Sequence, residues 1–161
     1  MNILILSCNT GEGHNYAGKA LKECIVSHGG TAELVDIMLL AGKQISRLVG
    51  GSYVGIVTHA PGFFQLLYKA GTLVSSKKRK SPVYYANTLL AQPLKKYLDA
   101  HSYDAIVTVH LFAAETLTYM KQKGILRQKV IAVETDYTCI PFWEETNCDA
   151  YIIPHPSLAQ E

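Results

Sequence analysis

Four short segments of the chain carry the side chains best suited to chemistry, and each follows an apolar run. They are Cys8–His14, the turn after Asp36, His110, and the pair Thr135 and Asp136. The carboxyl ends of parallel strands lie at one edge of a sheet, where α/β proteins bind their ligands. We therefore expect these segments to meet in one crevice.

The first segment, SCNTGEGHNYAGKA, combines a glycine-containing turn with the start of a helix at or near His14. Free N–H groups and the positive end of the helix dipole can bind an anion or a developing negative charge there. The turn matches neither the GxGxxG fingerprint nor a P-loop, so a purely structural turn remains an equal alternative. The candidate anion or substrate loop comprises Asn9, Thr10, Gly11, Glu12, Gly13, His110 and Thr135.

Two residues are the catalytic candidates, His14 and Asp136. A histidine in the first turn of a helix meets a positive dipole, which favours the neutral imidazole, and a neutral imidazole can take a proton from a hydroxyl. The alternative for His14 is a helix-start histidine bonded to the backbone. Asp136 can bind a hydroxyl or orient a base, or serve as a turn residue. His110 is either part of the crevice or a buried histidine with internal partners.

The apolar runs predict a doubly wound α/β domain with a mostly parallel sheet. Strand, glycine turn, helix and strand follow one another in the first 36 residues, which is a βαβ unit with a right-handed crossover. Helices are expected over 14–28, about 85–100 and about 113–123, and strands over 2–7, 31–36, 105–109, 129–134 and 150–153. Four cysteines show neither CxxC nor zinc spacing, so we expect reduced thiols and no metal site.

Charge divides the chain into three parts. Residues 37–98 hold nine lysines and arginines and no acid, whereas residues 1–36 carry a net −2 and residues 99–161 a net −5. We expect a basic, mostly helical insertion at 37–98. Lysine and arginine side chains interspersed with aromatic side chains suit binding to an anionic membrane surface. Nucleic acid is the competing partner, and the apolar run PGFFQLL at 61–67 argues against it.

The residues expected to face membrane or acceptor are Tyr53, Pro61, Phe63, Phe64, Tyr68, Lys77, Lys78, Arg79, Lys80, Tyr84 and Tyr85. No apolar run reaches the roughly 18 residues of a spanning helix, and the start of the chain lacks the pattern of a secretory signal. We therefore expect a peripheral protein at the cytoplasmic face of the cell membrane.

Several segments in register resemble the N-terminal domain of the monogalactosyldiacylglycerol synthase and processive diacylglycerol glucosyltransferase family. They are ILSCNTGEGHNYAGKAL, YVGIVTHAPGFFQLLYKAG, YDAIVTVHLFAAE and VETDYTCIPFWEE. The resemblance implies the Rossmann-like N-terminal half of a GT-B glycosyltransferase. Residues 1–161 would then form a single acceptor- and membrane-binding domain, and the donor-binding C-terminal domain of the same polypeptide would be absent from this chain.

The resemblance also implies an activity: inverting transfer of a hexose from a UDP-sugar to diacylglycerol, with no cofactor. The UDP-sugar would be bound mainly by the missing domain, so the fragment alone would be inactive. His14 matches the family's histidine, Thr135-Asp136 its TD motif and Trp143 its downstream tryptophan, whereas Cys139-Ile140-Pro141 stands where plant members carry a second histidine. The alternative is a stand-alone module that binds anionic lipid or nucleotide without catalysis.

Overall fold

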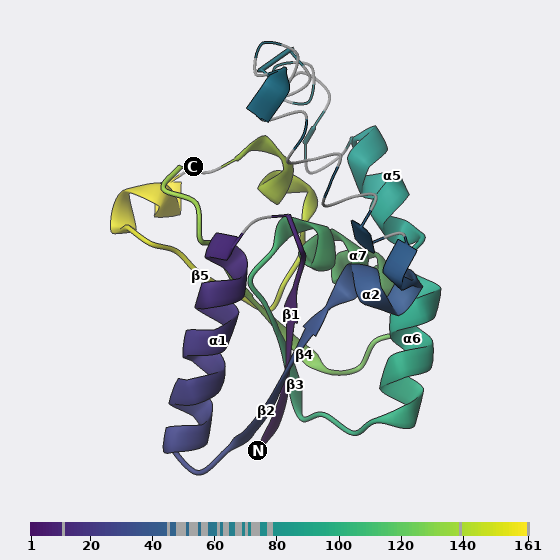
Figure 1. Ribbon diagram of the computed structural model, residues 1–161, viewed down its shortest axis with the longest axis vertical. Coiled ribbons are helices and arrows are strands. Elements are labelled where there is room, and N and C mark those ends of the chain that lie inside the picture. Colours follow the sequence, from purple (N-terminus) through teal and green to yellow (C-terminus); the bar gives the residue numbers. More distant parts are fainter. Residues whose placement is uncertain are drawn as a thin grey trace.

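The protein is a parallel five-stranded sheet with helices on both faces, as seen in a computed structural model (Figure 1). The structure describes residues 1–10, 12–44, 79–138 and 140–160, together with 46, 47, 51, 55, 58–60, 62, 65, 66, 69, 71, 75 and 76. The strands are β1 (Asn2–Ser7), β2 (Thr31–Asp36), β3 (Ala105–Thr108), β4 (Lys129–Val133) and β5 (Ala150–Ile152). Their order in the sheet is β2-β1-β3-β4-β5, and every neighbouring pair is parallel.

The first βαβ unit is confirmed. Helix α1 (Glu12–Ser27) begins slightly before His14, and Gly29 follows its end with a φ of 79°, a conformation that glycine adopts without strain. Gly18 lets the helix approach the sheet, because a Cβ at this position would lie 2.7 Å from Cδ1 of Leu34. The register pairs Ile3 with Ala32 across β1 and β2.

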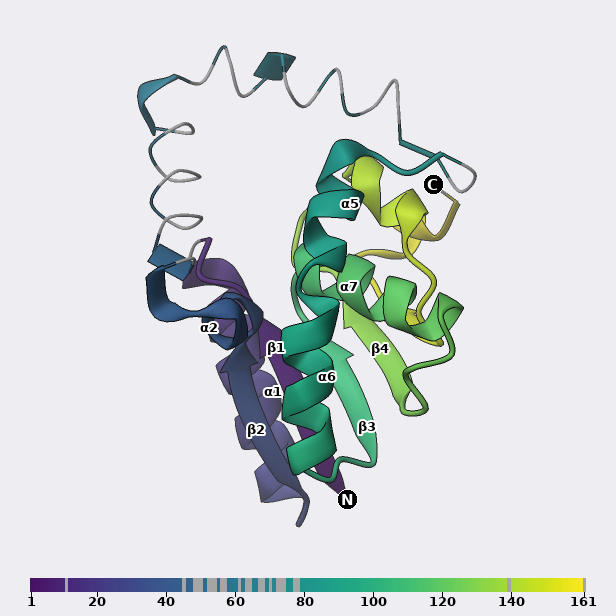
Figure 2. The same ribbon diagram turned by 90° about the vertical axis from the view of Figure 1, so that its right-hand side faces the viewer.

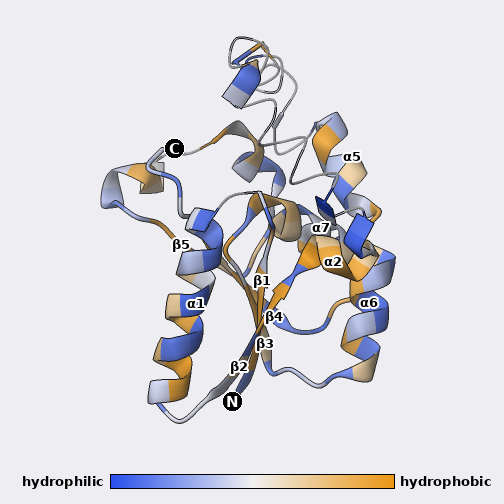
Figure 3. Ribbon diagram, viewed as in Figure 1, coloured by the Kyte–Doolittle hydropathy of each residue, from blue (hydrophilic) through white to orange (hydrophobic). Residues whose placement is uncertain are grey.

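Each face of the sheet has its own core. Alternate residues of β1 point to opposite faces, so Ile3 and Ile5 pack against α1, whereas Leu4 and Leu6 pack against the other helices. Those helices are α2 (Ile37–Ala41), α5 (Pro82–Thr88), α6 (Ala91–Ala100) and α7 (Leu111–Gln122). Figure 2 shows α5, α6 and α7 covering this face. The strands are largely apolar, whereas α1 combines hydrophilic and hydrophobic residues (Figure 3). Both faces of the sheet are therefore covered, as a parallel sheet requires.

The single helix expected over about 85–100 is wrong, because the chain forms two helices, α5 and α6. Pro93 has no N–H to donate to Leu89, where a continuous helix would need one. The chain turns instead through Leu89 and Leu90, whose N–H groups donate to Ala86 and Asn87 over 3.2 and 3.0 Å. Within 37–98 the described residues include the helices α2, α5 and α6 and no strand, and many of the residues from 45 to 78 lie outside the described part.

A buried carboxylate ties the start of α5 to the 3-10 helix η1 (Pro141–Glu145). The side chain of Glu145 is fully buried and accepts from Ser81 N over 2.9 Å and from Ser81 Oγ over 3.1 Å. Lys80 Nζ donates to the backbone carbonyl of Glu145 over 2.6 Å. The chain returning from the basic segment is thus fixed beside the residues that follow Thr135-Asp136. A second 3-10 helix, η2 (Pro156–Gln160), follows β5.

A second buried acid, Glu115, lies in the middle of α7. Asn87 Nδ2 donates to its Oε2 over 2.5 Å, whereas Oε1 has no hydrogen-bond partner among the described residues. Burial raises the pKa of Glu115 to about 8, against the opposing hydrogen bond from Asn87. The folded protein therefore holds a neutral carboxylic acid at this position at neutral pH.

Replacing Glu115 with Gln tests this assignment through the pH dependence of stability. Between the unfolded pKa of 4.5 and the folded pKa of about 8, the folded state binds a proton that the unfolded state does not. The free energy of unfolding should therefore fall as pH rises across this window. Urea unfolding at about pH 5 and about pH 8 should show a smaller loss in Glu115→Gln than in the wild type. Equal losses in both proteins would contradict a neutral Glu115.

Candidate functional site

The site lies at the point in the sheet where successive strands stop being added on one side of β1 and start being added on the other. From β1 the chain passes to β2 on one side, and it later returns to β3 on the other side of β1. Such a switch point, at the carboxyl ends of β1 and β3, is the usual ligand site of doubly wound folds. The loops after β1, β3 and β4 meet there through the side chains of Thr10, His14, His110 and Thr135.

His14 is held by one ring nitrogen. Its Nδ1 lies 2.9 Å from the backbone carbonyl of Val109 and 2.7 Å from Oγ1 of Thr135. A carbonyl oxygen can only accept, so we assign the proton to Nδ1 and the lone pair to Nε2. No hydrogen bond to Nε2 occurs within the described part of the chain, and the side chain is half-buried. His14 is therefore arranged to accept a proton at Nε2.

Thr135 supplies the contact from the third loop. It follows β4 and Glu134, and its hydroxyl shares the Nδ1–H of His14 with the Val109 carbonyl. Asp136, the other catalytic candidate, is half-buried beside it, and no hydrogen bond joins its carboxylate to His14 among the described residues. In this structure a backbone carbonyl and a threonine orient the imidazole, which is the role considered for Asp136.

His110 uses both ring nitrogens inside the fold. As the N-cap of α7 it accepts from Phe112 N at Nδ1 over 3.1 Å, and so its proton lies on Nε2, 2.6 Å from Oγ1 of Thr10. Its ring meets that of His14 edge to face, with the centroids 4.5 Å apart. Burial, followed by the charge of His14, lowers the pKa of His110 to about 3. Both ring nitrogens therefore have partners inside the fold, which fits the alternative of a buried histidine with internal partners.

The thiol of Cys8, in the loop after β1, is not suited to act as a nucleophile. Cys8 follows β1 and is fully buried. Burial, with a smaller contribution from the Asp36 carboxylate, raises the pKa of the Cys8 thiol to about 12. Since the thiolate is the reactive form, covalent catalysis by Cys8 is disfavoured. Among the side chains described above, His14 is the one whose contacts leave a ring nitrogen without a partner in the described part of the chain.

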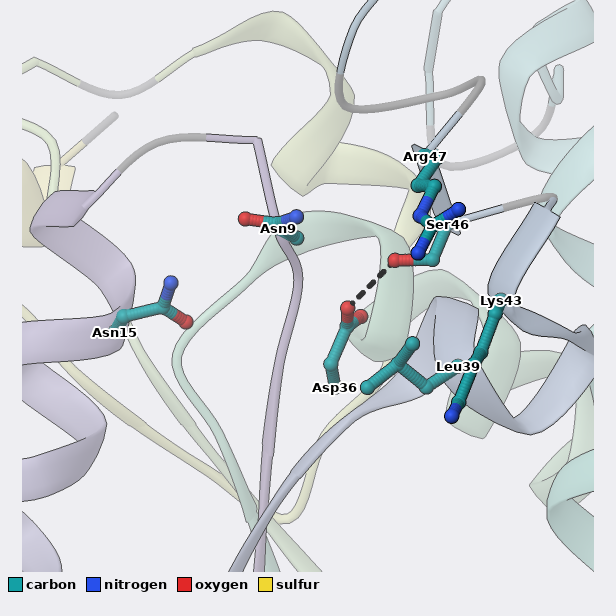
Figure 4. Close-up of a pocket in the computed structure, with 7 residues that line it drawn as sticks. All are labelled: Asn9, Asn15, Asp36, Leu39, Lys43, Ser46 and Arg47. Carbon is teal, nitrogen blue, oxygen red and sulfur yellow. Dashed lines mark hydrogen bonds between the residues drawn. The ribbon is translucent and has the colours of Figure 1, made fainter.

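An open pocket of about 390 Å³ adjoins the site over the ends of β1 and β2 (Figure 4). The Asp36 carboxylate at its base is already used, since it accepts from Met38 N and from Ser46 Oγ, each over 2.9 Å. On the α1 side the Asn15 side chain is fixed by Ser7, whose hydroxyl donates to its Oδ1 over 2.7 Å. The lining residues are Asn9, Asn15, Asp36, Leu39, Lys43, Ser46 and Arg47. The pocket therefore presents mostly hydrogen-bonding groups and two cations.

The rest of the expected anion or substrate loop has a mixed outcome. Asn9 and Glu12 are exposed, and Glu12 lies in the first turn of α1, where its carboxylate meets the positive end of the helix dipole. Gly13 has open space around its Cβ position, and Gly11 lies outside the described residues. Glu12 therefore competes with any anion that approaches this helix end.

Of the residues expected to face the membrane, some are exposed, some are buried and some lie outside the described residues. Tyr85 and Arg79 are exposed. Tyr84 is only 3% exposed and its hydroxyl donates to Gln122 over 3.2 Å, so the expectation that Tyr84 faces lipid is wrong. Lys80 is half-buried and bound to the Glu145 carbonyl. Tyr53, Pro61, Phe63, Phe64, Tyr68, Lys77 and Lys78 lie outside the described residues.

Sequence patterns gave no signal for two parts of the site. The Val109 carbonyl is a backbone group, and nothing in its residue type indicates that it binds His14. The pocket lining from Lys43, Ser46 and Arg47 depends on the path that the chain takes after β2 and α2.

The described residues contain no cluster of three or more potential metal ligands. Within the same residues, none of the helices combines the length and apolar character needed to cross a bilayer.

The state of His110 can be tested by a pH titration of its ring signals in NMR spectra. Because its folded pKa is about 3, His110 should remain neutral and protonated at Nε2 from about pH 8 down to about pH 5. The unfolded chain takes up this proton near pH 6.5, so the buried neutral ring also lowers stability as pH falls below that value. Titration of His110 near pH 6 would contradict the buried geometry.

Comparison with known proteins agrees with the resemblance seen in the sequence. A family model described as monogalactosyldiacylglycerol (MGDG) synthase matches residues 14–161. Neither the curated proteins nor the solved structures gave a match. The matched range begins at His14 and includes Val109, His110 and Thr135, so the contacts of the site fall within it. The chain belongs to the MGDG synthase family, glycosyltransferases of glycolipid synthesis, and corresponds to its N-terminal domain.

Proposed function

We propose that this chain is the acceptor side of a membrane-associated glycosyltransferase that moves a hexose from a UDP-sugar to diacylglycerol. The observation that carries the proposal is the fixed imidazole of His14 at the switch point, in a chain of the MGDG synthase family. Its Nδ1 is occupied by the fold and its Nε2 is available to a substrate. This is the arrangement that a general base needs.

The reaction we propose is a single inverting displacement. Nε2 of His14 takes the proton of the free glycerol hydroxyl while the oxygen forms a bond to the anomeric carbon. The bond from that carbon to the UDP oxygen breaks at the same time, and the leaving diphosphate carries the new negative charge. The imidazolium formed on His14 is stabilised by the Val109 carbonyl and the Thr135 hydroxyl at Nδ1.

The two substrates require surfaces beyond the His14 crevice. We propose that a C-terminal domain of the same polypeptide binds most of the UDP-sugar and that no cofactor takes part. We also propose that the basic block at 37–98 binds the anionic cytoplasmic face of the membrane, which would bring diacylglycerol to His14. The nine cations of this block, without a neighbouring acid in its sequence, support that part of the proposal.

Replacing His14 with Asn in the complete protein tests the assigned base. The Asn amide can still donate to the Val109 carbonyl, as Nδ1 does, but it has no counterpart of Nε2. We expect kcat for glycosyl transfer to fall by about 10² to 10⁴, the usual contribution of a general base. A radiolabelled UDP-sugar assay with dispersed diacylglycerol measures it.

The matched control is His28→Asn, which changes the exposed histidine at the other end of α1. This variant should retain normal transfer, because the described partners of the His28 ring all lie at its own helix end. Turnover of His14→Asn close to that of the control would exclude His14 as the base.

Vesicle flotation tests the membrane surface. Binding of the chain to anionic vesicles should weaken with added salt and fall by roughly 10²-fold to 10³-fold when Lys77, Lys78, Arg79 and Lys80 are replaced by Gln, at about 1 kcal/mol for each cation near the surface. A control variant replaces four exposed cations outside the block, Lys19, Lys22, Lys123 and Arg127. Equal loss in both variants would show only a net-charge effect. Tight binding to duplex nucleic acid with a steep salt slope would favour the competing partner.

A further inference from the structure

The glycine-containing loop before α1 is joined to the rest of the site by one buried hydrogen bond. Thr10 is 6% exposed, and its Oγ1 accepts from Nε2 of His110 over 2.6 Å. Of the described loop residues Asn9, Thr10, Glu12 and Gly13, Thr10 is the one whose side chain reaches a loop from another strand. We refer to the Thr10–His110 hydrogen bond as the latch.

The His110 end of the latch is rigid. Besides capping α7 through Nδ1, His110 donates from its backbone N to Thr108 Oγ1 over 3.2 Å. Its carbonyl accepts from Thr108 Oγ1 over 2.9 Å and from Ala114 N over 3.1 Å. These bonds fix the ring relative to β3 and α7, so the position of its Nε2–H is set before Thr10 meets it.

The Thr10 end of the latch is part of the segment that leads directly into His14. Thr10 N donates to Cys8 O over 2.9 Å, which forms the tight turn after β1, and α1 begins at Glu12. A shift of this loop would move the first turn of α1 and with it the His14 ring, whose edge contact with His110 spans only 4.5 Å between centroids. The latch therefore helps to keep His14 within hydrogen-bond distance of the Val109 carbonyl.

We infer that Thr10 and His110 are positioning residues for the transfer reaction: their hydrogen bond holds the β1–α1 loop so that His14 keeps its place at the switch point. Neither residue touches the reacting atoms in this account. The inference rests on the proposed function, because it assigns the latch a purpose only if His14 is the base. It differs from a purely structural role, in which the bond would contribute to stability alone.

A double-mutant cycle in the complete protein tests the latch. Thr10→Val keeps the shape of the side chain and removes the hydroxyl acceptor. His110→Asn keeps an N-cap for Phe112 but is too short to reach Thr10. Each single variant should lower kcat by on the order of 10-fold to 100-fold through misplacement of His14, with KM for the acceptor changed by less than about twofold.

The double variant should be no slower than the worse single variant, because both changes break the same bond. Thr10→Ser restores the hydroxyl and should recover most of kcat. Thermal unfolding of all four variants identifies any that fail to fold, and His110→Asn with Thr10→Ser still decides the question if Thr10→Val does not fold. Near-normal kcat in the single variants, or effects that multiply in the double variant, would overturn the positioning role.

A spectroscopic measurement separates this inference from the proposed function. In NMR spectra of the chain, the Nε2 proton of His110 should exchange slowly with water in the wild type and in Thr10→Ser, and should be lost in Thr10→Val. If the signal behaves this way while His14→Asn remains active, the latch exists and the assignment of His14 as the base is wrong. If Thr10→Val retains the protected proton, the latch itself is wrong.

Discussion

The hydrogen bond from Nδ1 of His14 to the Val109 carbonyl is the contact on which the rest of the site depends. It is 2.9 Å long and joins the first helix to the loop after the third strand, positions 95 residues apart in the sequence. Because a carbonyl only accepts, this bond fixes the tautomer of the imidazole as well as its direction. It also places the lone pair of the neutral imidazole on Nε2.

The architecture explains why such a contact can be made. Separate cores on the two faces of the sheet hold α1 against one side and α7 against the other, and both helices begin at the carboxyl edge of the strands. Gly18 allows α1 to lie close to β2, and His110 caps α7 beside the end of β1. His14 and His110 therefore meet between two helix starts that are positioned by different halves of the hydrophobic core.

The sequence predicted the parts of this arrangement that arise from local patterns. Apolar runs and glycine turns indicated the strands and α1, and the strand ends located Thr135 and His14 at one edge. The break between α5 and α6 was missed because the apolar spacing continues through Pro93. A buried His110 with internal partners was one of the two alternatives, but the identity of its partner Thr10 and the burial of Tyr84 could not be predicted, since both depend on contacts between segments far apart in the chain. The Val109 carbonyl has no side-chain signature at all.

The most direct test of the central claim is the protonation of His14 itself, read from long-range ¹H–¹⁵N correlations of its imidazole ring in the neutral form. A proton on Nδ1 and a lone pair on Nε2 is the result expected from the Val109 carbonyl and the Thr135 hydroxyl. The ring would then be ready to accept a proton from an acceptor hydroxyl. A proton on Nε2 would contradict the proposed role of His14, because Nε2 could not then act as a base.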